Sequence, residues 1–175
     1  NRDAILLRLK QNLDDIYIMG QVPEDIDGVA EPFMDNPIVV VAPADHPLAT
    51  EAQISPTRLA QEPFILREEG SGTRGLIEYV LKRYGIERRV TMEMSSSEGI
   101  KRAVEANLGV AVLSRNVIRN EVKNGSLAAL DIRDLNTKRD FYVIHNRKRK
   151  FLPLMEKFHD FILAKRTSID GGSGS

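Results

Sequence analysis

The feature that most constrains the fold is the alternation of short strand-like runs with helix-like runs along most of the chain. Runs rich in Val, Ile, Leu and Phe are separated by stretches whose apolar residues recur at helical spacing. The expected strands are DDIYIMG, NPIVVVAP, PFILRE, RVTMEM, GVAVLS, LAALDI and DFYVIHN, and the expected helices cover 2–12, SPTRLAQ, 73–84, 97–107, 115–123 and 151–164. This alternation is typical of an α/β fold in which crossover helices connect parallel strands.

The middle of the chain is predicted to form a compact βαβαβ unit, bracketed by apolar runs at 38–43 and 140–146. A chain that leaves one lobe and returns to it needs two crossing segments, so we interpret these runs as crossover strands between two Rossmann-like lobes. The expected division is 1–40 with 142–168 for lobe I, 41–141 for lobe II, and 169–175 for a Gly/Ser linker or an added tail.

The composition excludes several classes of function. Lys plus Arg and Asp plus Glu both total 25, and this balance argues against a free-standing nucleic-acid binder. No apolar run approaches the roughly 18 residues of a membrane span, and NRDAILLRLK lacks the apolar core of a secretory signal. The absence of Cys excludes disulfides and thiolate catalysis. We therefore expect a soluble, cytoplasmic protein without a membrane partner.

The first candidate site is the stretch EEGSGTRG, between a predicted strand and a predicted helix. Gly72 lets the backbone approach a ligand closely, and Ser71 or Thr73 can cap the helix. Exposed N–H groups at a helix start attract anions, and Arg74 adds a positive charge suited to carboxylate or phosphate. The stretch lacks the Gly-Lys-Ser/Thr ending of a Walker loop. The alternative interpretation is a capped helix with a surface arginine.

A second junction, MEMSSSEGIKRAV, places Ser95, Ser96 and Ser97 between the next strand and helix. Its structural alternative is a capping box formed by Ser95 and Glu98. In open α/β sheets, ligands bind outside the carboxyl ends of the strands, where both junctions are expected. The sequence therefore predicts that two helix N-termini contribute to one anion site.

A third junction, NLGVAVLSRNVI, places Ser114 and Arg115 after a strand, with Gly109 as an expected helix C-cap. We interpret this junction as a helix end and a helix start without direct ligand contact.

The remaining residues indicate no catalytic centre. His46, His145 and His159 are scattered without metal-ligand spacing, so they are interpreted as packed or surface histidines. Nothing resembles an activated Ser-His-Asp set, and no carboxylate pair is placed for acid–base chemistry. We therefore expect a protein that is not an enzyme and that carries no metal or cofactor.

The ordered set of segments resembles one known family. NRDAILLRLKQNLDDIYIMG, PIVVVAPADHPLA, PFILREEGSGTR, SSSEGIKRAVEANLGVAVLS and FYVIHNRKRKFLPLMEKFHDFIL resemble the effector-binding domain of LysR-type transcriptional regulators over about residues 1–165. IMGQVPED and REEGSGTRGLIEYVLKRYGI are most similar to the CbbR/CmpR-like subgroup, which controls carbon-fixation and inorganic-carbon uptake operons.

The resemblance implies a fold like type 2 periplasmic binding proteins, with a small anionic metabolite held between the lobes. In the subgroup such effectors are 2-phosphoglycolate, ribulose 1,5-bisphosphate, NADPH or 2-oxoglutarate. Carried onto this chain, the contacts would be Ser71, Gly72, Thr73 and Arg74, with 95–97 nearby. These are the junctions already selected on physical grounds.

The resemblance also implies partners beyond this chain. A full-length regulator would be a homodimer or tetramer and would contact DNA only through a helix-turn-helix domain, which this sequence does not contain. The first strand and helix of lobe I are expected before Asn1, which would leave lobe I incomplete, and the terminal GGSGS indicates an engineered permuted or sensor form. The alternatives are a periplasmic-type solute-binding protein and an enzyme on a related two-lobed scaffold.

Overall fold

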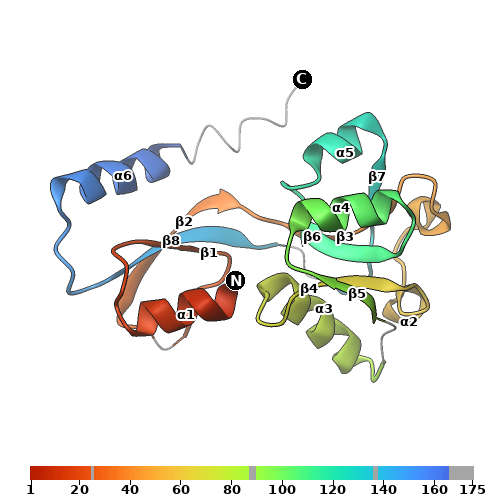
Figure 1. The fold of residues 1–175 in the computed structure, drawn as a ribbon, viewed down its shortest axis with the longest axis horizontal. Coiled ribbons are helices and arrows are strands. Elements are labelled where there is room, and N and C mark those ends of the chain that lie inside the picture. The colour runs from red at the N-terminus through yellow and green to blue at the C-terminus, as the bar shows by residue number, and fades with distance from the viewer. Residues whose placement is uncertain (25, 87–89, 136–137, 166–175) are drawn as a thin grey trace. The chain divides into compact units, whose positions relative to one another are not determined.

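The computed structural model describes residues 1–24, 26–86, 90–135 and 138–165 (Figure 1). Its contacts divide the chain into two compact units. Unit 1 contains Asn1–Asn36 together with the residues from Lys138 onward, and unit 2 contains Pro37–Thr137. The tail expected at 169–175 lies outside the described residues.

Unit 2 is built on a five-stranded sheet with the order β5-β4-β6-β3-β7. The strands are β3 (Ile38–Pro43), β4 (Phe64–Arg67), β5 (Val90–Met94), β6 (Val110–Ser114) and β7 (Leu127–Leu130). The helices are η1 (Pro47–Thr50), α2 (Pro56–Leu59), α3 (Gly72–Arg83), α4 (Ser97–Glu105) and α5 (Arg119–Asn124).

The predicted βαβαβ unit is confirmed, because β4 pairs in parallel with both β5 and β6. The expectation of parallel pairing is wrong for β3, which runs antiparallel to β6 and β7. Ile38, the first residue of β3, pairs with Ser114, the last residue of β6. The chain thus enters the sheet at the edge where β6 ends, so β3 must run in the opposite direction.

Helices cover both faces of this sheet, as the apolar character of its strands predicts. Alternate residues of β3 join two different cores. Val40 packs in the core that contains α3, and Val41 packs in the core that contains α4. All six residues of β3 are consequently buried.

Gly109 is not the helix C-cap that the sequence predicted. Helix α4 ends at Glu105, and Asn107 takes the left-handed conformation after it, with φ +57°. Gly109 instead has φ +153°, and a Cβ there would lie 2.4 Å from the carbonyl oxygen of Pro63. The glycine is needed because the start of β6 approaches the backbone before β4 closely.

Unit 1 contains a three-stranded antiparallel sheet with the order β1-β8-β2. Its strands are β1 (Tyr17–Met19), β2 (Gly28–Asp35) and β8 (Asp140–Asn146), and its helices are α1 (Arg2–Lys10) and α6 (Pro153–Ala164). One sheet face packs against α1 through a small core that includes Leu9, Tyr17 and Ile144.

Strand β2 was not predicted, because its sequence GVAEPFMD contains Gly and Pro and lacks regular alternation. It lies at the edge of the sheet, where Pro32 is tolerated, and its register shifts between Pro32 and Met34. Pairing with the central strand β8 therefore decides its conformation, against weak local propensity.

The boundaries expected near residues 40 and 141 fall inside β3 and β8. The structure places β3 wholly in unit 2 and β8 wholly in unit 1. Both strands pair with a neighbour on each side, which holds them within their own sheets. The contacts instead divide the chain between Asn36 and Pro37 and between Thr137 and Lys138.

Candidate functional site

The carboxyl ends of β4 and β5 lie side by side in unit 2. The strands pair in parallel, and their last residues, Arg67 and Met94, are register partners. Helix α3 begins at Gly72, a few residues after β4, and α4 begins at Ser97, a few residues after β5. The structure thus brings the two junctions selected from the sequence to one edge of the sheet.

Ser71 occupies the N-cap position of α3, but its side chain makes no capping hydrogen bond. Its hydroxyl lies 2.9 Å from the hydroxyl of Thr73, and the Ser71 residue is only 8% exposed. The two hydroxyls therefore form a pair held in place beside the first turn of α3. Either hydroxyl can donate a hydrogen bond to an anion while accepting a hydrogen bond from the other.

The first turn of α3 has backbone donors that are left without an acceptor. Within the described residues, the structure shows no hydrogen-bond acceptor for the N–H groups of Gly72, Thr73 and Arg74. Gly75 donates to the Ser71 carbonyl and so starts the helical ladder. Unpaired N–H groups and the positive end of the helix dipole favour an anion at this position.

Arg74 is already engaged by protein groups. Its Nε donates to Glu78 at 2.9 Å, and one terminal nitrogen donates to Glu93 and, at 3.2 Å, to the Arg67 carbonyl. Hydrogen bonds to Glu78 and then Glu93 raise the pKa of Arg74 above its usual value. Arg74 thus braces the end of β4 through its Nε and one of its two terminal nitrogens.

Arg67 connects the two junctions and was missed in the sequence analysis. Its guanidinium donates to both oxygens of Glu68, at 2.8 and 2.9 Å, and to the Ser97 hydroxyl at 3.4 Å. The hydrogen bonds from Arg67 lower the pKa of Glu68. The signal available in the sequence was a charged residue at the end of an otherwise buried strand.

Ser96, rather than Ser95, caps α4. The Ser96 hydroxyl accepts from the Gly99 N–H at 3.2 Å, which satisfies one donor of the first turn. The capping box predicted from Ser95 and Glu98 is therefore wrong by one residue. Glu98 instead forms ion pairs with Lys101 at 2.7 Å and Arg102 at 3.1 Å. Ser95 and Ser96 are exposed, while Ser97 is half-buried beside Arg67.

At the third junction, the Ser114 hydroxyl accepts from the Asn116 N–H at 3.2 Å and starts a local turn. A turn thus follows β6, and α5 begins at Arg119, four residues later than the helix start expected at residue 115.

A second positively charged feature lies in unit 1. Burial lowers the pKa of Arg139, and the nearby positive charge of Arg2 adds to this effect. Among the described residues the Arg139 guanidinium has no ion-pair partner, and Nε of Arg2 is buried without a hydrogen bond. Sequence reasoning missed these arginines, which are far apart in the chain and follow no motif. An anion bound near them would offset their mutual repulsion.

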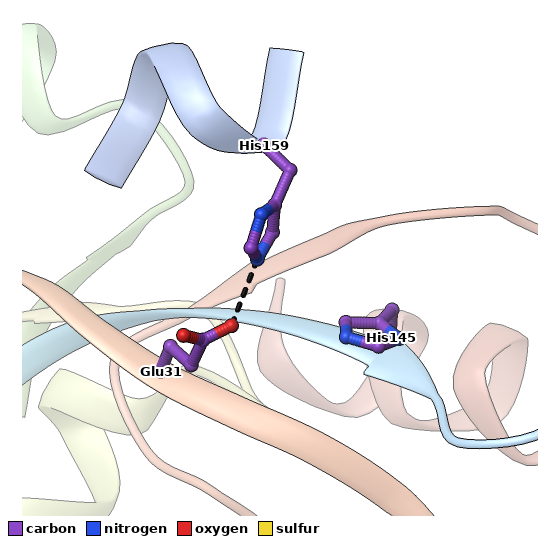
Figure 2. A group of neighbouring side chains, drawn as sticks. All are labelled: Glu31, His145 and His159. Carbon is purple, nitrogen blue, oxygen red and sulfur yellow. Dashed lines mark hydrogen bonds and ion pairs between the residues drawn. The ribbon is translucent and has the colours of Figure 1, made fainter. Parts of the chain in front are cut away.

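The interpretation of the histidines as scattered is wrong for two of them. His145 on β8 and His159 on α6 lie together with Glu31 on β2 (Figure 2). The ring centroids of the two histidines are 5.9 Å apart. His46 is separate, in unit 2, where its Nε2 lies 3.6 Å from Glu62.

No helix in the described ranges combines the length and the apolar character needed to cross a bilayer.

Comparison with known proteins shows the family to which the chain is similar. The family model described as the LysR substrate binding domain matches residues 1–167. The RuBisCO operon transcriptional regulator of Acidithiobacillus ferrooxidans is 44% identical, over 99% of this chain and 56% of that protein. The transcriptional activator CmpR of a Synechocystis strain is 40% identical, over 94% of this chain and 54% of that protein. The chain thus spans about half the length of these curated relatives.

A solved structure supports the same assignment. The CcmR regulatory domain of Synechocystis PCC6803, in complex with 2-PG, has a TM-score of 0.88 and 37% identity. The match covers 97% of this chain and 81% of that one. The α/β class of the type 2 periplasmic-binding-protein kind, predicted from the sequence, is confirmed. On its sequence and its fold, the chain belongs to the LysR substrate-binding domain family.

Proposed function

We propose that this chain is the effector-sensing domain of a transcription regulator and that it binds a small anionic metabolite at the junctions after β4 and β5. The observation that carries the proposal is the pairing of Arg67 with Met94, which brings the starts of α3 and α4 to one sheet edge. Unit 1 and unit 2 would be its two regulatory lobes.

The contacts expected for an anion can be ranked from the geometry. The unpaired N–H groups of Gly72 and Thr73 and the hydroxyls of Ser71 and Thr73 are the primary donors. The hydroxyls of Ser95, Ser96 and Ser97 line the start of α4 and are secondary candidates. Arg74 would contribute mainly by holding the end of β4 in place.

The energies indicate how many of these contacts are needed. A helix end contributes at most about 2 kcal/mol, and a hydrogen bond to a charged group contributes about 1.5–3 kcal/mol. Micromolar affinity corresponds to about 8 kcal/mol. Several donors must therefore act together.

We infer that the effector is 2-phosphoglycolate or a related carbon-metabolism signal. The subgroup resemblance and the relatives named as RuBisCO operon regulators support this choice, as does the similar CcmR regulatory domain in complex with 2-PG. A phosphate group suits the helix-start N–H donors, and a carboxylate suits the neighbouring hydroxyls.

The full regulator would act on genes for CO2 fixation or inorganic-carbon uptake in the cytoplasm. It would do so as a homodimer or tetramer and would contact DNA through a separate helix-turn-helix domain. The effector would act by population shift. It could shift the equilibrium between two conformations of the regulator only by as much as its affinities for those conformations differ. Binding and release, without turnover, would then be sufficient for the domain's role.

The direct test is a thermal-shift screen of the chain against 2-phosphoglycolate, ribulose 1,5-bisphosphate, 2-oxoglutarate and NADPH. A ligand that binds only the folded state must raise the midpoint of unfolding. We expect 2-phosphoglycolate to raise it, and the double variant S71A/T73A to lose most of the shift.

The matched control is Thr50→Ala, an exposed threonine whose hydroxyl donates to the Pro47 carbonyl at 3.1 Å. It should respond to the metabolite as the parent chain does. An equal shift in S71A/T73A and the parent would contradict the proposed site. Chemical conversion of the metabolite, lost in S71A/T73A, would favour an enzyme instead.

A further inference from the structure

The side-chain cluster of unit 1, formed by Glu31, His145 and His159, offers two imidazoles and one carboxylate in a small volume. One potential ligand atom from each residue lies within 4.8 Å of the others. Figure 2 shows the imidazole of His159 extending from α6 toward Glu31, with His145 beside them on β8. The cluster belongs to a single unit and shares no residue with the proposed effector contacts.

Strand pairing explains why two of the three residues meet. In the β2–β8 ladder Val29 is opposite His145, and Glu31 is opposite Val143. Because side chains alternate between faces along a strand, Glu31 and His145 project from the same face as diagonal neighbours. The opposite face packs against α1, so this face is left to α6.

His159 completes the cluster from α6. Its Nε2 lies 2.8 Å from a carboxylate oxygen of Glu31, and the His159 side chain is only 13% exposed. Its other nitrogen, Nδ1, lies 3.5 Å from Asp160. A carboxylate near the second nitrogen is a common way to orient a metal-binding imidazole.

His145 is also oriented by a neighbouring group. Its Nδ1 lies 3.2 Å from the backbone carbonyl oxygen of Asn146. A proton on Nδ1 would donate to that oxygen and leave the lone pair of Nε2 available to a metal ion. Phe151 packs against both imidazoles, at centroid distances of 4.6 and 5.4 Å, and adds an apolar wall to the cluster.

We propose that Glu31, His145 and His159 form a binding site for a divalent transition-metal ion, with Zn²⁺ as the probe of choice. Two nitrogen ligands and one oxygen ligand suit Zn²⁺, whereas Mg²⁺ and Ca²⁺ prefer oxygen ligands only. Ligand atoms around one Zn²⁺ are separated by roughly 3–4 Å, which small side-chain rotations can reach from the present arrangement. Water would fill the remaining coordination position.

Such an ion would connect α6 to the sheet, because its ligands come from β2, β8 and α6. The hydrogen bond between His159 and Glu31 already holds the helix at this point. A metal ion would replace this hydrogen bond by three coordinate bonds. It would thereby stabilise unit 1 independently of the effector.

The test is calorimetric titration of the chain with ZnCl2 at neutral pH, alongside thermal unfolding with and without Zn²⁺. We expect one ion per chain with micromolar affinity, and no binding of MgCl2. At about 100-fold excess over the dissociation constant, Zn²⁺ should raise the unfolding midpoint by about 5 °C or more. Each of E31Q, H145Q and H159Q should weaken binding at least about tenfold.

His46→Gln is the matched control. His46 is also 13% exposed and also faces a carboxylate, Glu62 at 3.6 Å, but it has no second histidine beside it. This variant should bind Zn²⁺ as the parent does. Circular dichroism of the metal-free variants separates loss of the site from loss of the fold, and E31Q preserves the shape of the side chain.

Two results would overturn the proposal. The first is an absence of Zn²⁺ binding to the folded parent chain, which would reduce the cluster to an ion pair. The second is Zn²⁺ binding that persists in folded E31Q, H145Q and H159Q. Neither result depends on whether the chain binds 2-phosphoglycolate.

Discussion

The hydroxyl groups of Ser71 and Thr73 lie 2.9 Å apart, and neither caps the helix that starts beside them. A serine at an N-cap position usually accepts a hydrogen bond from the backbone of the first turn. Here that backbone stays open on α3, whereas Ser96 does cap α4. The two helix starts therefore differ: α4 has a side-chain cap, whereas the first turn of α3 has N–H donors that an external acceptor could use.

Thr73→Ala should weaken binding of 2-phosphoglycolate about tenfold or more. The substitution removes one hydroxyl donor to a charged ligand, worth about 1.5–3 kcal/mol, and leaves Ser71 without its partner. Calorimetric titration of parent and variant measures the change. Because the two hydroxyls are coupled, S71A/T73A should lose less affinity than the sum of the single losses. Strict additivity would contradict the hydroxyl pair as a unit.

Arg74→Lys separates positioning from direct binding. Lysine keeps the charge, but its single nitrogen cannot replace both Nε, which donates to Glu78, and the terminal nitrogen, which donates to Glu93 and the Arg67 carbonyl. We expect a loss of about 1 kcal/mol in the free energy of unfolding, and a smaller loss of effector affinity than in Thr73→Ala. Denaturant unfolding and titration of the same samples give both quantities. A large loss of effector affinity without a loss of stability would instead indicate that Arg74 contacts the effector directly.

Gly109→Ala should destabilise the chain by at least about 2 kcal/mol. Its Cβ would lie 2.4 Å from the Pro63 carbonyl oxygen, a backbone atom that also accepts from the Val110 N–H at 2.8 Å. Denaturant unfolding measures the effect. Gly75→Ala is the control: nothing lies within 4 Å of its added Cβ in α3, so it should be neutral or stabilising.

The ion pair of Lys101 with Glu121 predicts a specific dependence of stability on pH. The hydrogen bond from Lys101, 2.7 Å from the carboxylate, lowers the pKa of Glu121 below its usual value of 4.5. The contribution of ionised Glu121 to the stability of the fold is therefore fully present above about pH 4.5. It is lost as the pH falls through the lower pKa that Glu121 has in the folded state. Hydrogen bonds to Glu121 and Glu98 raise the pKa of Lys101, so its contribution is lost only in strong alkali.

Glu121→Gln should lower the unfolding midpoint at pH 7 and reduce the further decrease between pH 5 and pH 3. Thermal unfolding followed across this range provides the measurement. Asp45→Asn, at an exposed position of unit 2, should leave the pH profile unchanged. An unaltered acid profile in Glu121→Gln would show that the pair does not contribute to acid stability.

The sequence determined the local elements where pattern and composition agree. The buried runs of β3, β4 and β6 and the periodic runs of α3 and α4 were all predicted, as was the end of α3 before Gly85. Hydrophobic periodicity and glycine conformation are properties of short segments, so they can be read without the fold. The serine and threonine junctions could be located for the same reason, because each lies where a predicted strand is followed by a predicted helix.

Tertiary structure alone decided the relationships between distant segments. The antiparallel direction of β3, the edge strand β2, and the place of Gly109 against Pro63 all depend on strand pairing that no local pattern encodes. Arg74 was predicted from its position and charge, but its carboxylate partners lie on α3 and β5. Glu31, His145 and His159 are spread over three elements and meet only because β2 pairs with β8 and α6 packs above them. Local patterns determine which segments form, whereas long-range pairing and packing determine which side chains meet.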